Sequence, residues 1–471
     1  MGLAIVYSGC DGAMVHHPGL AHNFRGCVDL LDPKAVADNV GRKRRVLCTG
    51  FSCSRRLTPL DIGGGTTRFQ SFGLPSPRAE RKSMKAPQAV RSILLAVFPL
   101  LLVLQVVVWS VYLPAAWNGR TDFRCFYVAG YMVRSGLASR LYDYETEEKL
   151  QDSLVFPSRQ DGVKPFIHLP YEALIFAPFS LMKFRTAYVA FLILNCGLLV
   201  ASILLLSRVV HDRLPLLLVM AAGFLPFSFA LASGQDSIIM LFLLSAALFM
   251  LERERNVLAG FLAGLILFRF QIAIPIFLLF LAWRRWKFAA GFALCALTAL
   301  PLSLALVGLA QARTYAQALM TMSLGSPDAA HIKYNQTAAQ MPNFRGFITV
   351  VAENHISIFW VHAAILLCSV TLIFWLSRQS PKNGCHAMLM AIPATAMVSY
   401  HLYIHDVSLI IIPAALVLLR SVNSRLLSYV GALAAFLAPV CAISLDNLFL
   451  AAIPVLLLAV SVTSAESAAE S

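Results

Sequence analysis

Residues 92–114 read SILLAVFPLLLVLQVVVWSVYLP, an apolar run without a single charged side chain. A run of about 20 apolar residues is what a helix needs to cross the hydrocarbon core of a bilayer. Basic residues cluster just before it, at Arg81, Lys82, Lys85 and Arg91. Because cytoplasmic flanks are enriched in Lys and Arg, we expect the N-terminus of this helix to be cytoplasmic.

Similar apolar blocks follow to the end of the chain, separated by short turns. They cover roughly 186–207, 214–232, 236–252, 257–268, 271–283, 288–308, 356–376, 385–401, 407–420, 426–443 and 447–463. Alternate turns are basic, whereas the opposite set holds Arg269 with Asp236, Asp406 and Asp446. We therefore expect an all-α polytopic membrane protein of about 12 transmembrane helices (10–14), with the second set of turns outside.

Composition supports this class. Hydrophobic residues make up 58% of the chain and charged residues 13%, whereas soluble domains carry about 25% charged residues. The net charge of +14 arises from 38 Lys and Arg against 24 Asp and Glu. Since it lies mainly in the N-terminal region and the short turns, it favours contact with anionic membrane lipids and excludes nucleic acid as a partner.

The chain divides into three parts. Residues 1–91 are rich in Gly, Pro, Ser and Arg without any sustained period, so we expect a disordered cytoplasmic extension or a mis-called start. Residues 92–463 form the transmembrane domain, and 464–471 are a short tail. Two large outer loops, 115–165 and 309–345, indicate that the protein acts on that face.

Two segments near the first outer loop break the simple pattern. Tyr144 to Leu154 reads as a short amphipathic interfacial helix, with Leu150 and Leu154 turned inward. His168 to Lys183 is apolar but carries two prolines, and counting it as a span would invert every later turn. We therefore interpret it as a piece that enters the membrane from the outer face and returns.

Asp122 follows the first span closely and places a carboxylate at the membrane boundary. A carboxylate there can act as a general base on a hydroxyl that comes within hydrogen-bond reach. The alternative is a surface aspartate, or an ion-pair partner for Arg120 or Arg124.

Other polar residues at the outer ends of the apolar blocks converge on the same boundary. They are His168, Gln235, Asp236, Arg269, Gln271, Arg345, His401, His405 and Asp406. Arg269, Arg345 and a histidine at this depth would suit a phosphate that carries a lipid tail, since the arginine fork matches phosphate oxygens. Singly, each is explained as well by interfacial anchoring.

We expect no metal ion and no other cofactor. His401 and His405 beside Asp406 could bind zinc if helical, but no third ligand cluster or HExxH motif accompanies them. The sequence lacks a glycine-rich phosphate loop, so nucleotide chemistry has no support. It shows neither an internal repeat nor mid-span charges, which many transporters display.

Several of these motifs, in order, resemble glycosyltransferase family 87, whose members are bacterial GT-C-fold enzymes related to polyprenyl-phosphomannose-dependent mannosyltransferases. The matching stretches are Asp122–Gly130, Gly136–Asp143, His168–Pro178, Gly234–Ser237, Pro342–Gly346 and His401–Asp406. The resemblance covers about 115–420. One departure concerns Arg269-Phe270-Gln271, where many relatives have Lys-Pro-Gln.

The resemblance implies a GT-C-like bundle and a sugar donor on a polyprenyl monophosphate. Transfer would go with inversion to a lipid or glycan acceptor, the sugar being mannose or another hexose. Asp122 matches the family's acidic residue and would be the general base. Arg345, Arg269 and His405 would neutralise the departing lipid phosphate, which makes a metal unnecessary and activity resistant to EDTA. The site would face the extracytoplasmic side of the plasma (inner) membrane.

Sugar or acceptor contacts are expected from aromatic and polar side chains. They are Tyr127, Tyr142, His168, Tyr171, Gln235, Asp236, Gln271, His401 and Asp406. Two other functions stay open: a lipid or solute transporter or flippase, and a non-catalytic protein of envelope-polysaccharide assembly. An Asp122→Asn variant separates these two functions from that of a glycosyltransferase. The substitution should abolish sugar transfer by an enzyme but leave a transporter or an assembly protein working.

Overall fold

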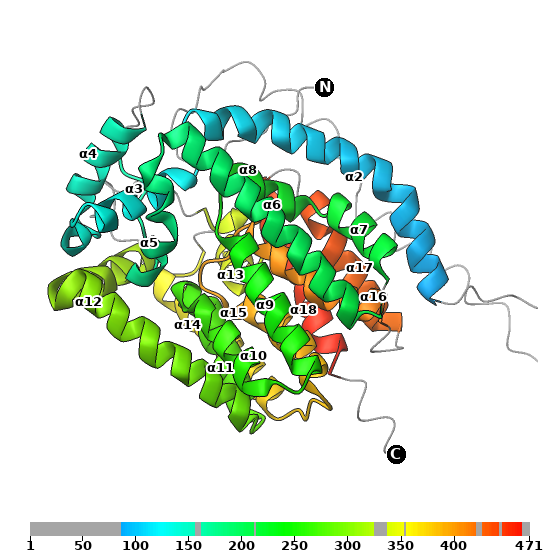
Figure 1. The fold of residues 1–471 in the computed structure, drawn as a ribbon. Coiled ribbons are helices and arrows are strands. Elements are labelled where there is room, and N and C mark those ends of the chain that lie inside the picture. The colour runs from blue at the N-terminus through cyan, green and yellow to red at the C-terminus, as the bar shows by residue number, and fades with distance from the viewer. Residues whose placement is uncertain are drawn as a thin grey trace, which may run out of the picture. The chain divides into compact units, whose positions relative to one another are not determined.

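The computed structural model describes residues 86–155, 162–211, 213–324, 337–352, 355–420, 426–441 and 445–463. These ranges are built from α-helices and short 3₁₀ helices and contain no β-strand (Figure 1). All of them belong to one compact unit. The all-α class predicted from the sequence is therefore confirmed for this part of the chain.

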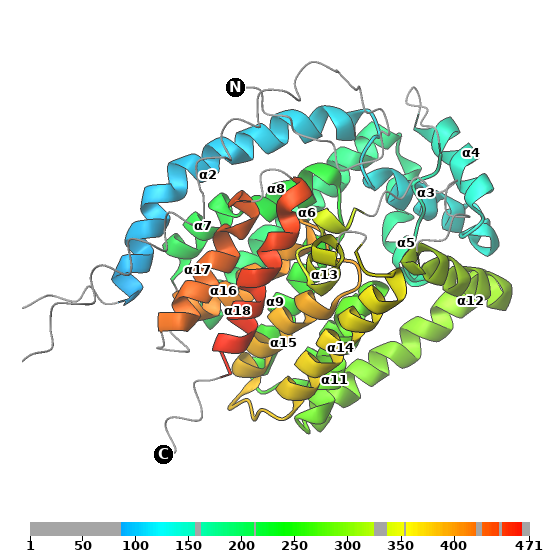
Figure 2. The same ribbon diagram turned by 180° about the vertical axis from the view of Figure 1, so that it is seen from behind.

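The first span is longer than expected. Helix α2 runs from Ala86 to Trp117 and so begins inside the predicted extension 1–91. The rest of that extension and the predicted tail 464–471 lie outside the described residues. α2 packs lengthwise along α7 (Leu214–Gly223) and α8 (Leu225–Ser233), as both ribbon views show (Figures 1 and 2).

Among the described residues, five helices are long and apolar enough to cross a membrane, or six if the bent pair α7 and α8 is one span. The five are Ser92–Trp117, Phe184–Val209, Asn256–Ala282, Trp286–Met320 and Ile358–Ser377. Shorter apolar helices of 10–17 residues are Ser237–Glu252, Gly384–Val398, Asp406–Leu418, Leu426–Val440 and Asn447–Ser461. The chain is thus a membrane protein, but the predicted number of about 12 spans is not confirmed.

The stretch Asn256–Ala282 is long and apolar enough for one span, but its two halves run in opposite directions, so it is bent back on itself. It comprises α10 (Asn256–Gly264), the 3₁₀ helix η3 (Leu265–Arg269) and α11 (Phe270–Ala282). α10 runs parallel to the start of α12 (Trp286–Leu324), whereas α11 runs antiparallel to it. The contacts that show this are Gly260–Phe288 and Gly264–Cys295 for α10, and Phe277–Phe292 and Phe280–Phe288 for α11. Arg269 therefore lies at the tip of a helical hairpin.

The first outer loop folds into short helices. They are α3 (Phe123–Arg134), η1 (Ala138–Arg140) and α4 (Tyr144–Leu154), followed by α5 (Pro170–Phe176) and η2 (Phe179–Leu181). α5 has seven residues, too few to cross a bilayer. α3, α4 and α5 gather beside α12 at one end of the bundle (Figure 1).

Much of the predicted second outer loop, 309–345, is helical. α12 continues past a kink at Gly308 (φ 78°) to Leu324. The short helix η5 (Ala338–Gln340) and α13 (Phe344–Ala352) follow beyond residues that are not described.

The helices at the core of the unit are apolar around their whole circumference. α9 (Ser237–Glu252), α15 (Gly384–Val398) and α16 (Ile411–Leu418) bury most of their residues, as expected for helices that are hydrophobic all round. The long helices α2, α6 (Phe184–Val209), α12 and α14 (Ile358–Ser377) instead expose large apolar side chains. Lipid contact explains such exposed apolar surface. α17 (Leu426–Cys441), η7 (Leu445–Ala451) and α18 (Ala452–Ser461) complete the unit.

Candidate active site

Asp122 lies immediately before the first turn of α3. Phe123, the first residue of that helix, anchors the turn. The Phe123 ring is fully buried against the rings of Phe184, Tyr188 and Phe191, with centroids 5.2–5.7 Å apart. The Asp122 carboxylate does not cap its own helix. Its side chain is 44% exposed, so it remains accessible to a substrate.

Two side chains from other segments hold this carboxylate. The Nζ atom of Lys164 lies 3.3 Å from Oδ1 of Asp122 and also donates to the Arg120 carbonyl at 2.6 Å. Gln235 donates from Nε2 to Oδ2 of Asp122. Both carboxylate oxygens therefore have a partner, which fixes the orientation of the carboxylate.

The surrounding charges keep Asp122 ionised. Partial burial alone would raise the pKa of Asp122, but the positive charges of Lys164, His405 and Arg269 hold that pKa below its ordinary value. Asp122 is therefore a carboxylate at neutral pH, which is the form that accepts a proton.

Helix α4 positions Lys164 through a buried polar clamp. The Gln151 amide pairs with the backbone of Lys164, accepting from its N–H at 3.1 Å and donating to its carbonyl at 2.6 Å. Glu147 accepts from Gln151 at 3.1 Å and from the Phe166 N–H at 2.9 Å. Arg124 reaches the same Gln151 oxygen at 3.2 Å. The clamp ties α3 and α4 to the segment that carries Lys164.

The predicted bounds of the amphipathic helix 144–154 agree with α4, but the predicted inward face is only partly right. Its most buried side chains are Glu147 and Gln151, while Leu150 and Leu154 are partly buried. The polar residues point inward because the segment around Lys164 offers them backbone hydrogen-bond partners. Asp143 caps the helix by accepting from the Thr146 N–H at 3.5 Å, and its other carboxylate oxygen accepts from the Thr146 hydroxyl at 2.7 Å.

The turn between α8 and α9 brings Gln235 and Asp236 to the site. Gly234 adopts a left-handed conformation (φ 70°), and a Cβ there would come within 2.7 Å of the Cβ of Phe123. Only glycine allows this close approach without strain. The turn is thereby docked against the residue next to Asp122.

Arg269, predicted to bind a lipid phosphate, is committed to a buried carboxylate. It donates to Asp236 through Nε at 2.9 Å and through a terminal nitrogen at 2.6 Å, and reaches Gln235 at 3.3 Å. Its other terminal nitrogen lies 3.9 Å from Oδ2 of Asp406. The guanidinium thus acts on a phosphate only by its field unless it leaves Asp236.

His168 and Glu172 lie against the same Asp236. The Nδ1 atom of His168 is 2.5 Å from Oε2 of Glu172 and 3.4 Å from Oδ2 of Asp236. All three side chains are buried, and one ligating atom of each lies within 4.8 Å of the others. Burial, with the nearby charge of Arg269, lowers the pKa of His168 to about 3, so its imidazole is neutral.

His405 and Asp406 lie close to this cluster. Asp406 accepts from the Ser237 hydroxyl at 2.8 Å and from the Tyr403 N–H at 3.2 Å. The Nε2 atom of His405 is 3.5 Å from Oδ2 of Asp406, and its side chain is partly accessible. Of the predicted phosphate ligands, His405 therefore lies in the neighbourhood of Asp122.

Arg345 belongs to an adjoining group with His401. Its guanidinium carbon lies 4.1 Å above the Tyr400 ring, and a terminal nitrogen lies 3.0 Å from Nδ1 of His401. Burial, together with Arg345 and Arg269, lowers the pKa of His401 to about 3. His401 is therefore neutral and accepts from Arg345. Residues 401–405 are not helical, so the condition under which His401 and His405 could share a zinc ion is not met.

The tyrosines predicted to contact sugar use their hydroxyls on the protein backbone. Tyr127 donates to the Met182 carbonyl at 2.8 Å, Tyr142 to that of His168 at 2.6 Å, and Tyr171 to that of Leu265 at 2.8 Å. Tyr142 and Tyr171 hold loops of the site in place. Tyr127 also lines a cavity of about 670 Å³ at the start of α6.

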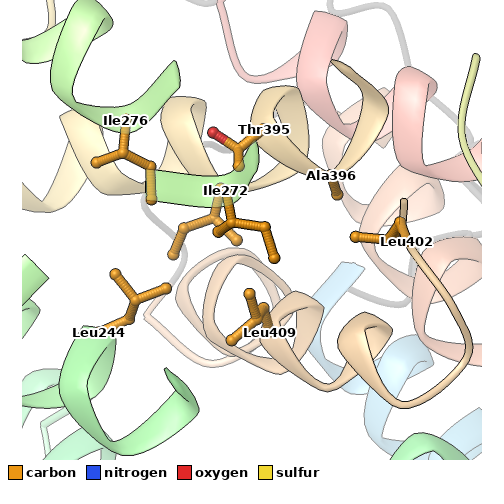
Figure 3. Close-up of a pocket in the computed structure, with 8 residues that line it drawn as sticks. Leu244, Ile272, Ile276, Thr395, Ala396, Leu402 and Leu409 are labelled. Atoms are coloured by element: carbon orange, nitrogen blue, oxygen red, sulfur yellow. The ribbon is translucent and has the colours of Figure 1, made fainter. Parts of the chain in front are cut away.

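Gln271 is half-buried at the start of α11, and the next residue, Ile272, lines an apolar pocket (Figure 3). The pocket is lined by Leu244, Ile272, Ile276, Ile392, Thr395, Ala396, Leu402 and Leu409. Thr395 supplies the one hydroxyl of that lining, so the pocket offers a sugar almost no hydrogen bonds.

Sequence reasoning missed two residues of the site. Lys164 pairs with Asp122, but a lone lysine in a predicted outer loop gives no signal of that contact. Glu172 could have been predicted from the sequence, because it follows His168 by four residues in a segment already identified as part of the site.

The sequence profile of glycosyltransferase family 87 matches residues 166–402, half of the chain. The match includes His168, Glu172, Asp236, Arg269 and Arg345. It begins after Asp122 and Lys164 and ends before His405. No curated protein and no solved structure matches the chain.

Proposed function

The chain belongs to glycosyltransferase family 87, and on that premise we propose that it moves a sugar, mannose or another hexose, from a polyprenyl monophosphate to an acceptor hydroxyl with inversion. The observation that carries the proposal is the accessible, ionised Asp122 carboxylate, oriented by Lys164 and Gln235. The acceptor is a lipid or glycan on the extracytoplasmic face of the cell membrane.

In this reaction Asp122 takes the proton of the acceptor hydroxyl. The acceptor oxygen forms its bond to the anomeric carbon while the bond from that carbon to the phosphate oxygen breaks, and polyprenyl phosphate leaves. The low pKa of Asp122 makes it a weak base. This suits an oxocarbenium-like transition state, in which the hydroxyl becomes acidic as its oxygen bonds to carbon.

Positive side chains stabilise the leaving phosphate. Arg345 is half-buried and held by the Tyr400 ring, so its fork is pre-oriented for phosphate oxygens. His405 offers a ring nitrogen next to Asp406. Arg269 contributes through its charge while it remains bonded to Asp236. Stabilisation of this kind acts on charge that develops in the transition state.

The test is turnover by the purified full-length protein with a panel of polyprenyl-phosphate sugars, scored as released polyprenyl phosphate. Asp122→Asn should lower the rate at least about 100-fold, the contribution of a general base. Glu145→Gln, a carboxylate with a 76% exposed side chain in α4, is the matched control and should retain the rate. Full activity of Asp122→Asn would overturn the mechanism.

A further inference from the structure

Three ligand-type side chains, all of them buried, meet next to the turn that carries Gln235, the partner of the proposed general base. His168 and Glu172 flank the start of α5 at a spacing of four residues, and Asp236 comes from the turn before α9. Their closest atoms lie 2.5 and 3.4 Å from Nδ1 of His168. The cluster thus joins two segments that are distant in sequence.

The buried atoms of this cluster are not satisfied. Nδ1 of His168 and both carboxylate oxygens of Glu172 have no aligned hydrogen-bond partner among the described residues. Glu172 is completely buried and His168 is 5% exposed, so bulk solvent does not reach these atoms. A buried polar group left in this state destabilises the folded protein unless a ligand supplies its partner.

Acidic side chains outnumber basic ones around the cluster. In the described part of this neighbourhood, the buried carboxyl groups of Glu172, Asp236 and Asp406 lie around the buried guanidinium of Arg269. Lys164 pairs with Asp122. Buried charges require pairing or metal coordination.

We propose that His168, Glu172 and Asp236 bind a divalent first-row transition-metal ion, with Zn²⁺ as its principal candidate. One imidazole nitrogen and two carboxylates form a ligand set that Zn²⁺ accepts, with further positions open to water. Such an ion supplies the partner that all three unsatisfied atoms lack, and its positive charge suits a buried site that is rich in carboxyl groups.

Neighbouring side chains already orient the ligands. Arg269 fixes the Asp236 carboxylate, and the rings of Phe126 and Phe166 pack on His168 with centroids 5.2 and 5.4 Å away. Tyr142 holds the His168 carbonyl. Partners that hold the ligands in place are a regular feature of metal sites.

This metal site is not part of the proposed transfer reaction. It differs from the prediction, made from the sequence, that the protein binds no metal. The ion would link α5 to the turn that carries Gln235, the residue bonded to Asp122. Its role is to position that turn, since the proposed phosphate ligands, Arg345 and His405, are outside the cluster.

Metal content tests the site without any measurement of turnover. The full-length protein, purified through a tag without histidines, is loaded with Zn²⁺, freed of excess ion by gel filtration, and analysed by mass spectrometry of its metals. We expect about one Zn²⁺ per chain and a higher apparent unfolding temperature, because a ligand of the folded state stabilises it. Loading with Co²⁺ should give the visible absorption of a coordinated ion.

Glu172→Gln and His168→Gln should each lose the bound Zn²⁺ and the Co²⁺ absorption. Glu147→Gln removes another buried carboxylate of the same region and should keep both. Wild-type protein with no stoichiometric Zn²⁺ and no Co²⁺ absorption overturns the site, even if a variant fails to fold. Equal metal in wild type and in folded Glu172→Gln and His168→Gln also overturns it. Since these readouts require no substrate, they stand or fall independently of the proposed transfer.

Discussion

The ammonium of Lys164 lies 3.3 Å from the carboxylate of Asp122, although 41 residues separate them in the sequence. Lys164 itself is held by the amide of Gln151 in α4. A charge that keeps Asp122 ionised is therefore held in place by a separate helix, α4. The acid limb of the pH–rate profile therefore depends on Lys164, a residue that belongs to no recognisable sequence motif.

Removing the charge of Lys164 should shift the pH profile. In Lys164→Met, burial acts on Asp122 with less opposition, so its pKa rises. Since Asp122 must be ionised to accept a proton, the acid limb of kcat/KM should move to higher pH. Lys149→Met removes an exposed lysine of α4 and is the control, with an unchanged profile. An identical acid limb in both variants would contradict the role of Lys164.

Arg345→Lys should weaken binding of the donor. Lysine keeps the charge but loses the planar fork that stacks on Tyr400 and contacts His401. We expect KM for the polyprenyl-phosphate sugar to rise about tenfold, equivalent to about 1.4 kcal/mol. Arg378→Lys changes another arginine stacked on a ring, that of Phe374, and should leave KM unaltered. Equal KM values for the two variants would count against phosphate binding by Arg345.

Gly130→Ala should destabilise the packing of α3 against α5. A Cβ at Gly130 would lie 2.4 Å from the backbone carbon of Phe176, which cannot move without shifting α5. Overpacking of this kind costs about 1–3 kcal/mol, and a lower apparent unfolding temperature in detergent would report it. Gly197→Ala, in helix α6 with open space around it, should be neutral or stabilising. Equal unfolding temperatures for both variants would refute the close contact.

Glu147 should make stability depend on pH. Burial raises its pKa well above the ordinary carboxyl value, although hydrogen bonds from Phe166 and Gln151 act in the opposite direction. A group whose pKa is raised on folding stabilises the protein below its unfolded-state pKa and loses that effect as pH rises through the folded-state value. The free energy of unfolding should therefore fall with rising pH.

In Glu147→Gln, which keeps an acceptor oxygen and cannot ionise, this part of the pH dependence should disappear. The measurement is the apparent unfolding temperature between about pH 5 and pH 9. Glu148→Gln changes the next residue, whose carboxylate accepts from the Gly162 N–H, and should retain the wild-type dependence. Parallel curves for wild type and Glu147→Gln would rule out a neutral Glu147.

The sequence by itself determined the helical membrane class and the family, because both rest on local patterns. Apolar runs such as 92–114 specify spans through their length alone, and the capping aspartate Asp143 marks α4 at its observed start. The stretch from His168 to Pro178 was also readable as a motif. Each of these signals is contained within a few turns of chain.

Only the tertiary structure decided which polar residues meet. The sequence shows that Arg269 is basic but not whether its partner is a phosphate or Asp236. The fold of the α10–α11 hairpin brings it to Asp236. Lys164 reaches Asp122, and Asp236 reaches His168, because helix packing joins their segments. Charge pairing depends on distances of a few ångströms between segments remote in sequence, and hydrophobic patterning does not encode those distances.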